Sequence, residues 1–138
     1  MMKVLILDGP SGSGKSTLRR AFYDKYKSDI LVIDRFTPCN WVYDYIRGID
    51  RREEIGKFEE EFDKNLNPYL VLLSAALDIL EERCLDRGRS PVYEFKEELE
   101  AFDIYFKEVC RYSRVMEIDG SNSIEFILRT VDNFLGGR

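Results

Sequence analysis

One eight-residue stretch constrains the fold of this chain more than any other feature. Gly9-Pro-Ser-Gly-Ser-Gly-Lys-Ser16 has glycines at its first, fourth and sixth positions, followed by a lysine and a serine. It comes after the apolar run 3–7 and before a helical pattern over 15–27. When a glycine-rich turn joins a strand to a helix, the backbone N–H groups of the turn and the N-terminus of the helix point toward the same site, which suits an anion. The stretch therefore predicts a phosphate-binding loop and, with it, binding of a nucleoside triphosphate.

Short apolar runs alternate with helical patterns along the rest of the chain. The runs at 30–33, 69–73 and 115–118 fit strands buried on both faces. Apolar spacing predicts helices over 15–27, 40–46, 51–66, 75–87, 95–109 and from 122 onward, the last capped by Asn122 and Glu125. We expect an α/β fold, a three-layer sandwich of the P-loop NTPase type with about four parallel strands in the order 2-1-3-4. Residues 1–138 are expected to form a single domain.

Composition excludes several classes of function. The chain has 138 residues, a net charge of −5, three cysteines and no histidine, which excludes Ser-His-Asp and Cys-His nucleophile systems and imidazole zinc sites. Scattered cysteines in no C-x-x-C pair are typical of reduced thiols and favour a cytoplasmic location. The acidic balance argues against a nucleic-acid partner. No apolar run reaches the about 18 residues of a membrane span, and Met1 to Leu7 is too short for a signal peptide.

Within the loop, each residue type suits phosphate binding. Glycines let the backbone N–H groups curl around a phosphate without side-chain clash. We expect Lys15, as an exposed side chain, to bring positive charge to the β- and γ-phosphates, and the hydroxyl of Ser16 to join a Mg²⁺ shell. The nucleotide-binding residues predicted in this way are Gly9, Ser11, Gly12, Ser13, Gly14, Lys15, Ser16 and Thr17.

Charged residues at other predicted strand ends extend the site. Asp34 closes the second strand and is a candidate Mg²⁺ ligand with Ser16, or an ordinary polar strand end. Arg35 follows it and would grip a phosphate, or form a salt bridge to Asp34 or Asp8. Asp8, directly before the first glycine, is a base, a metal-shell residue or a cap for the loop, and these alternatives stay open.

The segment 83–95 is predicted to act as a lid over the triphosphate. Arg83, Arg87 and Arg89 come at the end of a helix, and at least one of them, with Arg87 and Arg89 preferred, would neutralise charge that develops during phosphoryl transfer. The alternative is that they are cations favoured by the helix dipole. Trp41, Tyr43 and Tyr45 suit either base stacking or simple packing, and the acidic run 53–63 is expected to face solvent.

These segments together resemble the thymidylate kinases and the related deoxynucleoside kinases. Beyond the phosphate loop with its preceding acid, the similar segments are Ile33-Asp-Arg-Phe36, Tyr43, Asn67-Pro-Tyr69 with its strand, Arg83-Cys-Leu-Asp-Arg-Gly-Arg89 and Ile118-Asp-Gly-Ser121. The resemblance implies that Arg35 holds the acceptor phosphate, that Asp34 lies near Mg²⁺ and the attacking oxygen, and that the lid arginines clamp the donor. The chain departs from the family in lacking another strand and substrate-side helices before Asp34, and in having Ser74 in place of an acid. Thymidylate specificity therefore does not follow.

The function expected from all of these features is transfer of the γ-phosphoryl group of ATP, with Mg²⁺, to a small acceptor. The acceptor expected first is a nucleoside monophosphate or a nucleoside, in a pocket built by residues 36–66. The alternatives are a kinase of another small hydroxyl compound or of a polynucleotide 5′ end, and a nucleotide-binding switch that hydrolyses slowly. A membrane partner is not expected, and a homodimer is left open.

Overall fold

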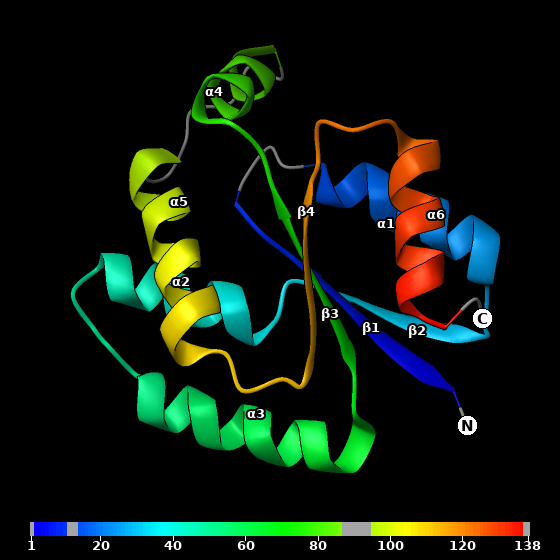
Figure 1. The fold of residues 1–138 in the computed structure, drawn as a ribbon. Helices are drawn as coiled ribbons and strands as arrows, with labels where there is room; N and C mark the ends of the chain where they lie inside the picture. The colour runs from blue at the N-terminus through cyan, green and yellow to red at the C-terminus, as the bar shows by residue number, and fades with distance from the viewer. Residues whose placement is uncertain (1, 11–13, 87–94, 137–138) are drawn as a thin grey trace.

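The computed structural model describes residues 2–10, 14–86 and 95–136 of the chain (Figure 1). The strands are β1 (Lys3–Asp8), β2 (Ile30–Asp34), β3 (Tyr69–Ser74) and β4 (Arg114–Asp119). The helices are α1 (Lys15–Tyr26), α2 (Thr37–Ile46), α3 (Arg52–Leu66), α4 (Leu77–Asp86), α5 (Phe95–Ile104) and α6 (Ile124–Phe134), with a π-helix (Tyr105–Val109) directly after α5.

The four strands form one parallel sheet in the order β2-β1-β3-β4, which confirms the predicted topology. The central strand β1 carries Leu5, Ile6 and Leu7 in succession, and all three side chains are fully buried. Alternate residues of a strand point to opposite faces, so a continuous apolar run requires cover on both sides of the sheet. The sequence pattern and the layered architecture therefore agree.

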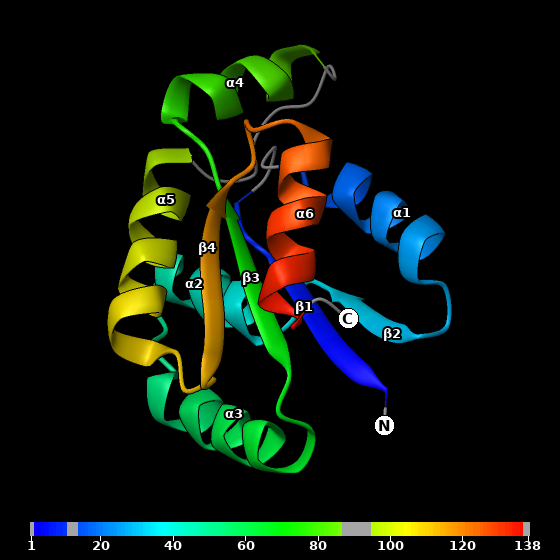
Figure 2. The ribbon, with the colours of Figure 1, turned by 45° about the vertical axis from the view of Figure 1, so that its right-hand side comes forward.

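Helices cover both faces of the sheet, as predicted. Figure 2 shows α1 and α6 on one side and α2 and α5 on the other. On the first side, Phe22 of α1 and Val131 of α6 pack in one core cluster with Leu5, Leu7 and Leu73. On the second side, the opposite faces of β1 and β3 pack against α2 and α5 in a cluster that includes Ile6, Leu70, Leu72, Trp41 and Phe102. No helix among the described residues is long and apolar enough to cross a membrane.

Several element ends differ from the prediction for local reasons. Helix α2 begins at Thr37 rather than Asn40, because Pro38 lies in its first turn, where a missing N–H costs nothing. Helix α5 ends at Ile104 and continues as the π-helix, so the segment 95–109 is not one regular α-helix. The cap of α6 is Ser123, whose side chain accepts from the backbone N–H of Phe126, and not Asn122.

The acidic run 53–63 does not simply face solvent, because Glu59 is fully buried. Its Oε2 accepts hydrogen bonds from Thr37 Oγ1 at 2.6 Å and from the Tyr105 hydroxyl at 2.7 Å, and its Oε1 accepts from the Arg111 N–H at 2.9 Å. Burial raises the pKa of this carboxyl, although the three donors pull it down. Glu59 therefore joins α3 to the first turn of α2 and to the π-helix.

Candidate functional site

The chemistry-bearing residues gather at the carboxyl edge of the sheet. Asp8, Asp34, Ser74 and Asp119 are the last residues of their strands, and parallel strands all end at the same edge. The glycine-rich loop leaves β1 at this edge, and α4 lies beyond the end of β3 (Figure 1). Ligands of open parallel sheets bind in this position, so the site residues at the described strand ends lie where the fold favours binding.

Two glycines of the loop have conformations that demand glycine. Gly9 has a φ of +144°, and a Cβ on it would lie 2.3 Å from the backbone oxygen of Leu73. Gly14 has a φ of +101° and is the N-cap residue of α1. The backbone of β1 thus turns against β3 and enters α1 with no side chain in the way. Ser11, Gly12 and Ser13 of the prediction lie outside the described residues.

Lys15 is buried, and the expectation of an exposed side chain was wrong. Its Nζ donates to the backbone oxygens of Gly9 at 2.6 Å and of Pro10 at 3.0 Å, and 7% of the residue is exposed. Burial lowers the pKa of the Lys15 ammonium, Asp8 opposes that shift, and Arg35 adds to it. The ammonium group therefore lies inside the loop, where an anion would be a better partner than two carbonyl groups.

Asp8 has the contacts of a cap. Its Oδ1 accepts from the backbone N–H of Gly9 at 2.8 Å, and its Oδ2 accepts from those of Phe36 and Cys39 at 3.0 Å each. The residue is fully buried, which raises the pKa of its carboxyl even though the three donors lower it. These contacts tie the phosphate loop to the N-terminus of α2, and of the three roles left open by the sequence they favour the cap.

Asp34 forms an ion pair that the sequence did not predict. Its Oδ2 lies 3.1 Å from Nη1 of Arg19, in the second turn of α1. Its Oδ1 is buried and has no hydrogen-bond partner among the described residues. Carboxylate, hydroxyl and phosphate oxygens are the kinds of ligand that Mg²⁺ takes, and the unpaired Oδ1 of Asp34 is a group of this kind. Among the described residues, no group of three or more acidic, cysteine or histidine side chains is placed to hold a metal ion by itself, so the metal role of Asp34 and Ser16 stays a prediction.

Arg35 has a strained backbone. Its φ of +64° is in the left-handed region, which a non-glycine residue adopts at some cost, and such strain gathers at functional sites. Its N–H still donates to the backbone oxygen of Leu7 at 2.9 Å, which fixes the turn beside β1. Neither predicted salt bridge of Arg35 forms, because Asp34 pairs with Arg19 and Asp8 accepts from backbone groups. The exposed guanidinium stays available for a ligand.

A pocket of about 260 Å³ adjoins the other end of the loop. Gly14 and Thr17 line it together with Leu73, Arg83 and Gly120. Nη2 of Arg83 donates to the backbone oxygen of Gly120 at 3.2 Å, which holds the guanidinium of α4 against the turn after β4. The pocket thus combines an apolar wall with a cation close to the loop. Residues 87–94 of the predicted lid segment 83–95, and with them Arg87 and Arg89, lie outside the described residues.

The aromatic residues of α2 divide into different environments. Trp41 is fully buried and stacks on Tyr45 at 4.6 Å between ring centroids, so Trp41 packs the core and is not free to stack on a base. Tyr43 donates its hydroxyl to Oε1 of Glu98 at 3.0 Å, and Glu98 is 1% exposed. Because Glu98 lies in the first turn of α5, this bond joins α5 to α2.

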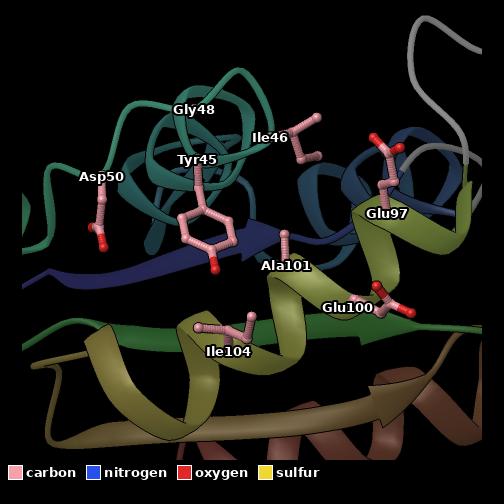
Figure 3. Close-up of a pocket in the computed structure, with 8 residues that line it drawn as sticks. All are labelled: Tyr45, Ile46, Gly48, Asp50, Glu97, Glu100, Ala101 and Ile104. Carbon is pink, nitrogen blue, oxygen red and sulfur yellow. The ribbon is translucent and has the colours of Figure 1, made fainter.

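A larger cavity of about 500 Å³ lies between α5 and the end of α2 (Figure 3). Asp50, Glu97 and Glu100 line this cavity together with Tyr45, and among the described residues no lysine or arginine lines it. Carboxylates repel phosphates at short range. This cavity is therefore unsuited to a phosphorylated ligand, although it is larger than the pocket beside the loop.

Comparison with known proteins identifies the fold. The deoxyadenosine kinase of M. mycoides, solved with bound dCTP, matches with a TM-score of 0.66 and 14% identity over 98% of this chain and 100% of that chain. A shikimate kinase from Bacteroides thetaiotaomicron matches with a TM-score of 0.55 and 14% identity over 99% of each chain. A gluconokinase from Sinorhizobium meliloti 1021 matches with a TM-score of 0.53 and 17% identity over 97% of this chain and 91% of that chain. The fold is that of the P-loop kinases. No protein-family model and no curated protein matches the sequence.

Within this P-loop kinase fold, sequence reasoning missed Arg19 and Glu98. The spacing of Arg19, four residues after Lys15, puts both side chains on one face of α1 and was a usable signal. For Glu98 the signal was a charged residue on the same helical stripe as Phe95 and Phe102, which are buried. The specific likeness to thymidylate kinases does not gain support from these comparisons.

Proposed function

We propose that this protein is a Mg-ATP-dependent phosphotransferase whose acceptor is a nucleoside monophosphate or a nucleoside. The observation that carries the proposal is the loop itself, in which Lys15 is buried against the carbonyl groups of Gly9 and Pro10 within a P-loop kinase fold. A buried ammonium group with a lowered pKa is strongly stabilised by an arriving anion. A triphosphate at the N-terminus of α1 supplies that anion.

The residues around the loop have distinct roles in this proposal. Lys15 would contact the β- and γ-phosphates. The base of the donor nucleotide would bind in the pocket that Arg83 lines together with Gly14 and Gly120. Ser16 and Asp34 would hold Mg²⁺ with the phosphate oxygens, and the ion would neutralise charge on the transferred group. Arg87 and Arg89 are proposed to close over the donor, in line with their place in the sequence.

The acceptor is proposed to lie between Arg35 and the wall formed by α2 and α5. Arg35 offers an exposed guanidinium suited to a phosphate. The M. mycoides deoxyadenosine kinase structures, solved with bound dCTP, with bound dATP and with the products dCMP and dCDP, support a nucleoside-type ligand in such a fold. The buried position of Trp41 leaves fewer aromatic faces for base stacking than the sequence suggested, which fits loose base selectivity.

A second candidate is a kinase of another small hydroxyl compound. The gluconokinase and shikimate kinase neighbours favour it, since both share the fold over almost the whole chain. A polynucleotide 5′ end and a slowly hydrolysing switch are further alternatives. The free thiols of Cys39 and Cys110 support the proposed reducing, cytoplasmic location.

Binding of the donor is tested by thermal unfolding with and without Mg-ATP. At ~100-fold over the dissociation constant, ligand binding stabilises the fold by about 2.7 kcal/mol. Lys15→Ala should remove most of this gain, while Lys57→Ala, on the exposed face of α3, should keep it. Each variant is compared with its own ligand-free state, because loss of Lys15 also leaves two loop carbonyl groups unpaired. Equal gains in wild type and Lys15→Ala would contradict the donor site.

The acceptor is tested with a panel of nucleoside monophosphates, nucleosides, sugars and 5′-hydroxyl oligonucleotides, assayed for acceptor-dependent ADP release. We expect stimulation by a monophosphate or nucleoside. Stimulation by a monophosphate should vanish in Arg35→Ala and persist in Arg20→Ala, a change at an exposed arginine of α1. Stimulation by sugars or oligonucleotides alone would favour the corresponding alternative, and ADP release that ignores every acceptor would favour the switch.

A further inference from the structure

The ion pair between Arg19 and Asp34 is only half formed. Arg19 Nη1 lies 3.1 Å from Asp34 Oδ2, and the two side chains are 36% and 15% exposed. Arg19 Nε and Asp34 Oδ1 are both buried, and neither has a hydrogen-bond partner among the described residues. A guanidinium and a carboxylate ordinarily meet through two parallel hydrogen bonds, one to each carboxylate oxygen, whereas here only Oδ2 accepts one.

Buried polar atoms without a partner are rare, because removing them from water costs free energy that only a hydrogen bond returns. Two such atoms in one contact therefore call for an explanation in the role of the pair. The single contact holds one oxygen of the Asp34 carboxylate and leaves the other, buried oxygen without a hydrogen-bond partner among the described residues.

The pair lies at the edge of the sheet where the phosphate loop begins. Arg19 follows Lys15 by four residues and so lies one turn further along the same face of α1. Asp34 pairs with Leu7 across the β1–β2 ladder, directly before the strained turn at Arg35. The negative charge of Asp34 acts on Lys15, where it opposes the lowering of the pKa that burial causes. Arg19 thus contacts the site through Asp34, at the carboxyl end of β2.

We infer that Arg19 is a positioning residue, which holds Oδ2 of Asp34 so that Oδ1 faces the reacting groups. This inference rests on the proposed function, because it assigns Arg19 a task in the same site. Arg19 touches neither donor nor acceptor in this account and acts through Asp34 alone. A lysine at position 19 would keep the positive charge but lose the planar geometry of the guanidinium.

A double-mutant cycle tests the inference. Arg19→Gln should lower kcat about 10–100-fold, the range typical of groups that orient an active-site ligand, with a smaller change in KM for ATP. In an Asp34→Asn background the same change should have little further effect, and Arg19→Lys should recover part of the loss. Arg20→Gln, at the neighbouring exposed position of α1, is the matched control and should leave kcat unchanged. Equal losses from Arg19→Gln in both backgrounds would overturn the inference.

A measurement without turnover separates this inference from the proposed function. The side-chain carboxyl resonance of Asp34 is followed by carbon NMR in the ligand-free protein. We expect Arg19→Gln to move this resonance and Arg20→Gln to leave it in place. An unchanged resonance in Arg19→Gln would show that Arg19 does not hold Asp34, whatever the enzyme's activity. Where no acceptor supports transfer, the kinetic cycle is run on Mg-ATP hydrolysis, in which water takes the place of the acceptor.

Discussion

Asp8 offers the sharpest prediction about stability, because its three hydrogen bonds connect the loop to α2. In Asp8→Asn, the amide oxygen can replace Oδ2 and keep the bonds to the N–H groups of Phe36 and Cys39. The amide NH₂ then faces the N–H of Gly9, which loses its acceptor. An unsatisfied buried donor costs about 1–3 kcal/mol, which is the loss expected in the free energy of unfolding. Asp8→Ala removes all three acceptors and should cost about 3 kcal/mol or more by the same reasoning.

The assay is urea unfolding of the ligand-free protein at neutral pH, with the midpoint and slope fitted together. Trp41, the single tryptophan, is fully buried and reports unfolding by fluorescence. Asp24→Asn is the control, since Asp24 is exposed on α1 and its change should stay within about 0.5 kcal/mol. If Asp8→Asn unfolds at the same urea concentration as Asp24→Asn, the bonds of Asp8 do not stabilise the loop and the reasoning fails.

Three further predictions address the loop, the buried carboxyl of α3 and the lid. Gly9→Ala should lower stability by about 1–3 kcal/mol and weaken ATP binding, because φ is +144° and the new Cβ would meet Leu73 O; an unperturbed urea midpoint would contradict this. Burial raises the pKa of Glu59 above its ordinary 4.5, so the folded protein binds the proton of this carboxyl more tightly than the unfolded chain does. The free energy of unfolding should therefore fall as pH rises from 4.5 through the pKa of Glu59 in the folded protein. Glu59→Gln should therefore flatten the stability–pH profile in that window, and a steeper profile would refute the shift. Arg87→Ala or Arg89→Ala should lower kcat about 10²–10⁴-fold with a modest effect on ATP affinity, and full turnover in both would leave them as helix-end cations.

The strands and their order could be predicted from the sequence because burial on both faces leaves a local mark. Runs such as Leu5-Ile-Leu7 contain no polar residue, and in the sheet β1 pairs with β2 on one edge and with β3 on the other. The positions of Asp34 and Asp119 at the carboxyl edge followed from the same runs. The phosphate loop could be predicted for a different reason, since its glycines meet a backbone requirement that no other residue satisfies.

The contacts between distant charged groups could not be predicted in this way. The choice of Arg19 rather than Arg35 as the partner of Asp34 depends on how α1 packs against β2. Lys15 is buried because the loop folds back over its ammonium group, which no periodicity records. Glu59 belongs to an acidic run that resembles a solvent-exposed face, and only the meeting of α2, α3 and the π-helix gives it three donors. The sequence shows that these charged residues exist, but the tertiary structure decides which of them contact one another.

Transfer of the labelled γ-phosphoryl group of ATP distinguishes a kinase from an NTPase, because only a kinase moves the label to an acceptor other than water. The protein is incubated with γ-labelled Mg-ATP and the panel of nucleoside monophosphates and nucleosides, and the products are separated by chromatography. We expect the label on a nucleotide product, and we expect Lys15→Ala to abolish its transfer while Lys57→Ala does not. Label found only in inorganic phosphate, or transferred equally well by Lys15→Ala, would show that the protein is not a kinase of this kind.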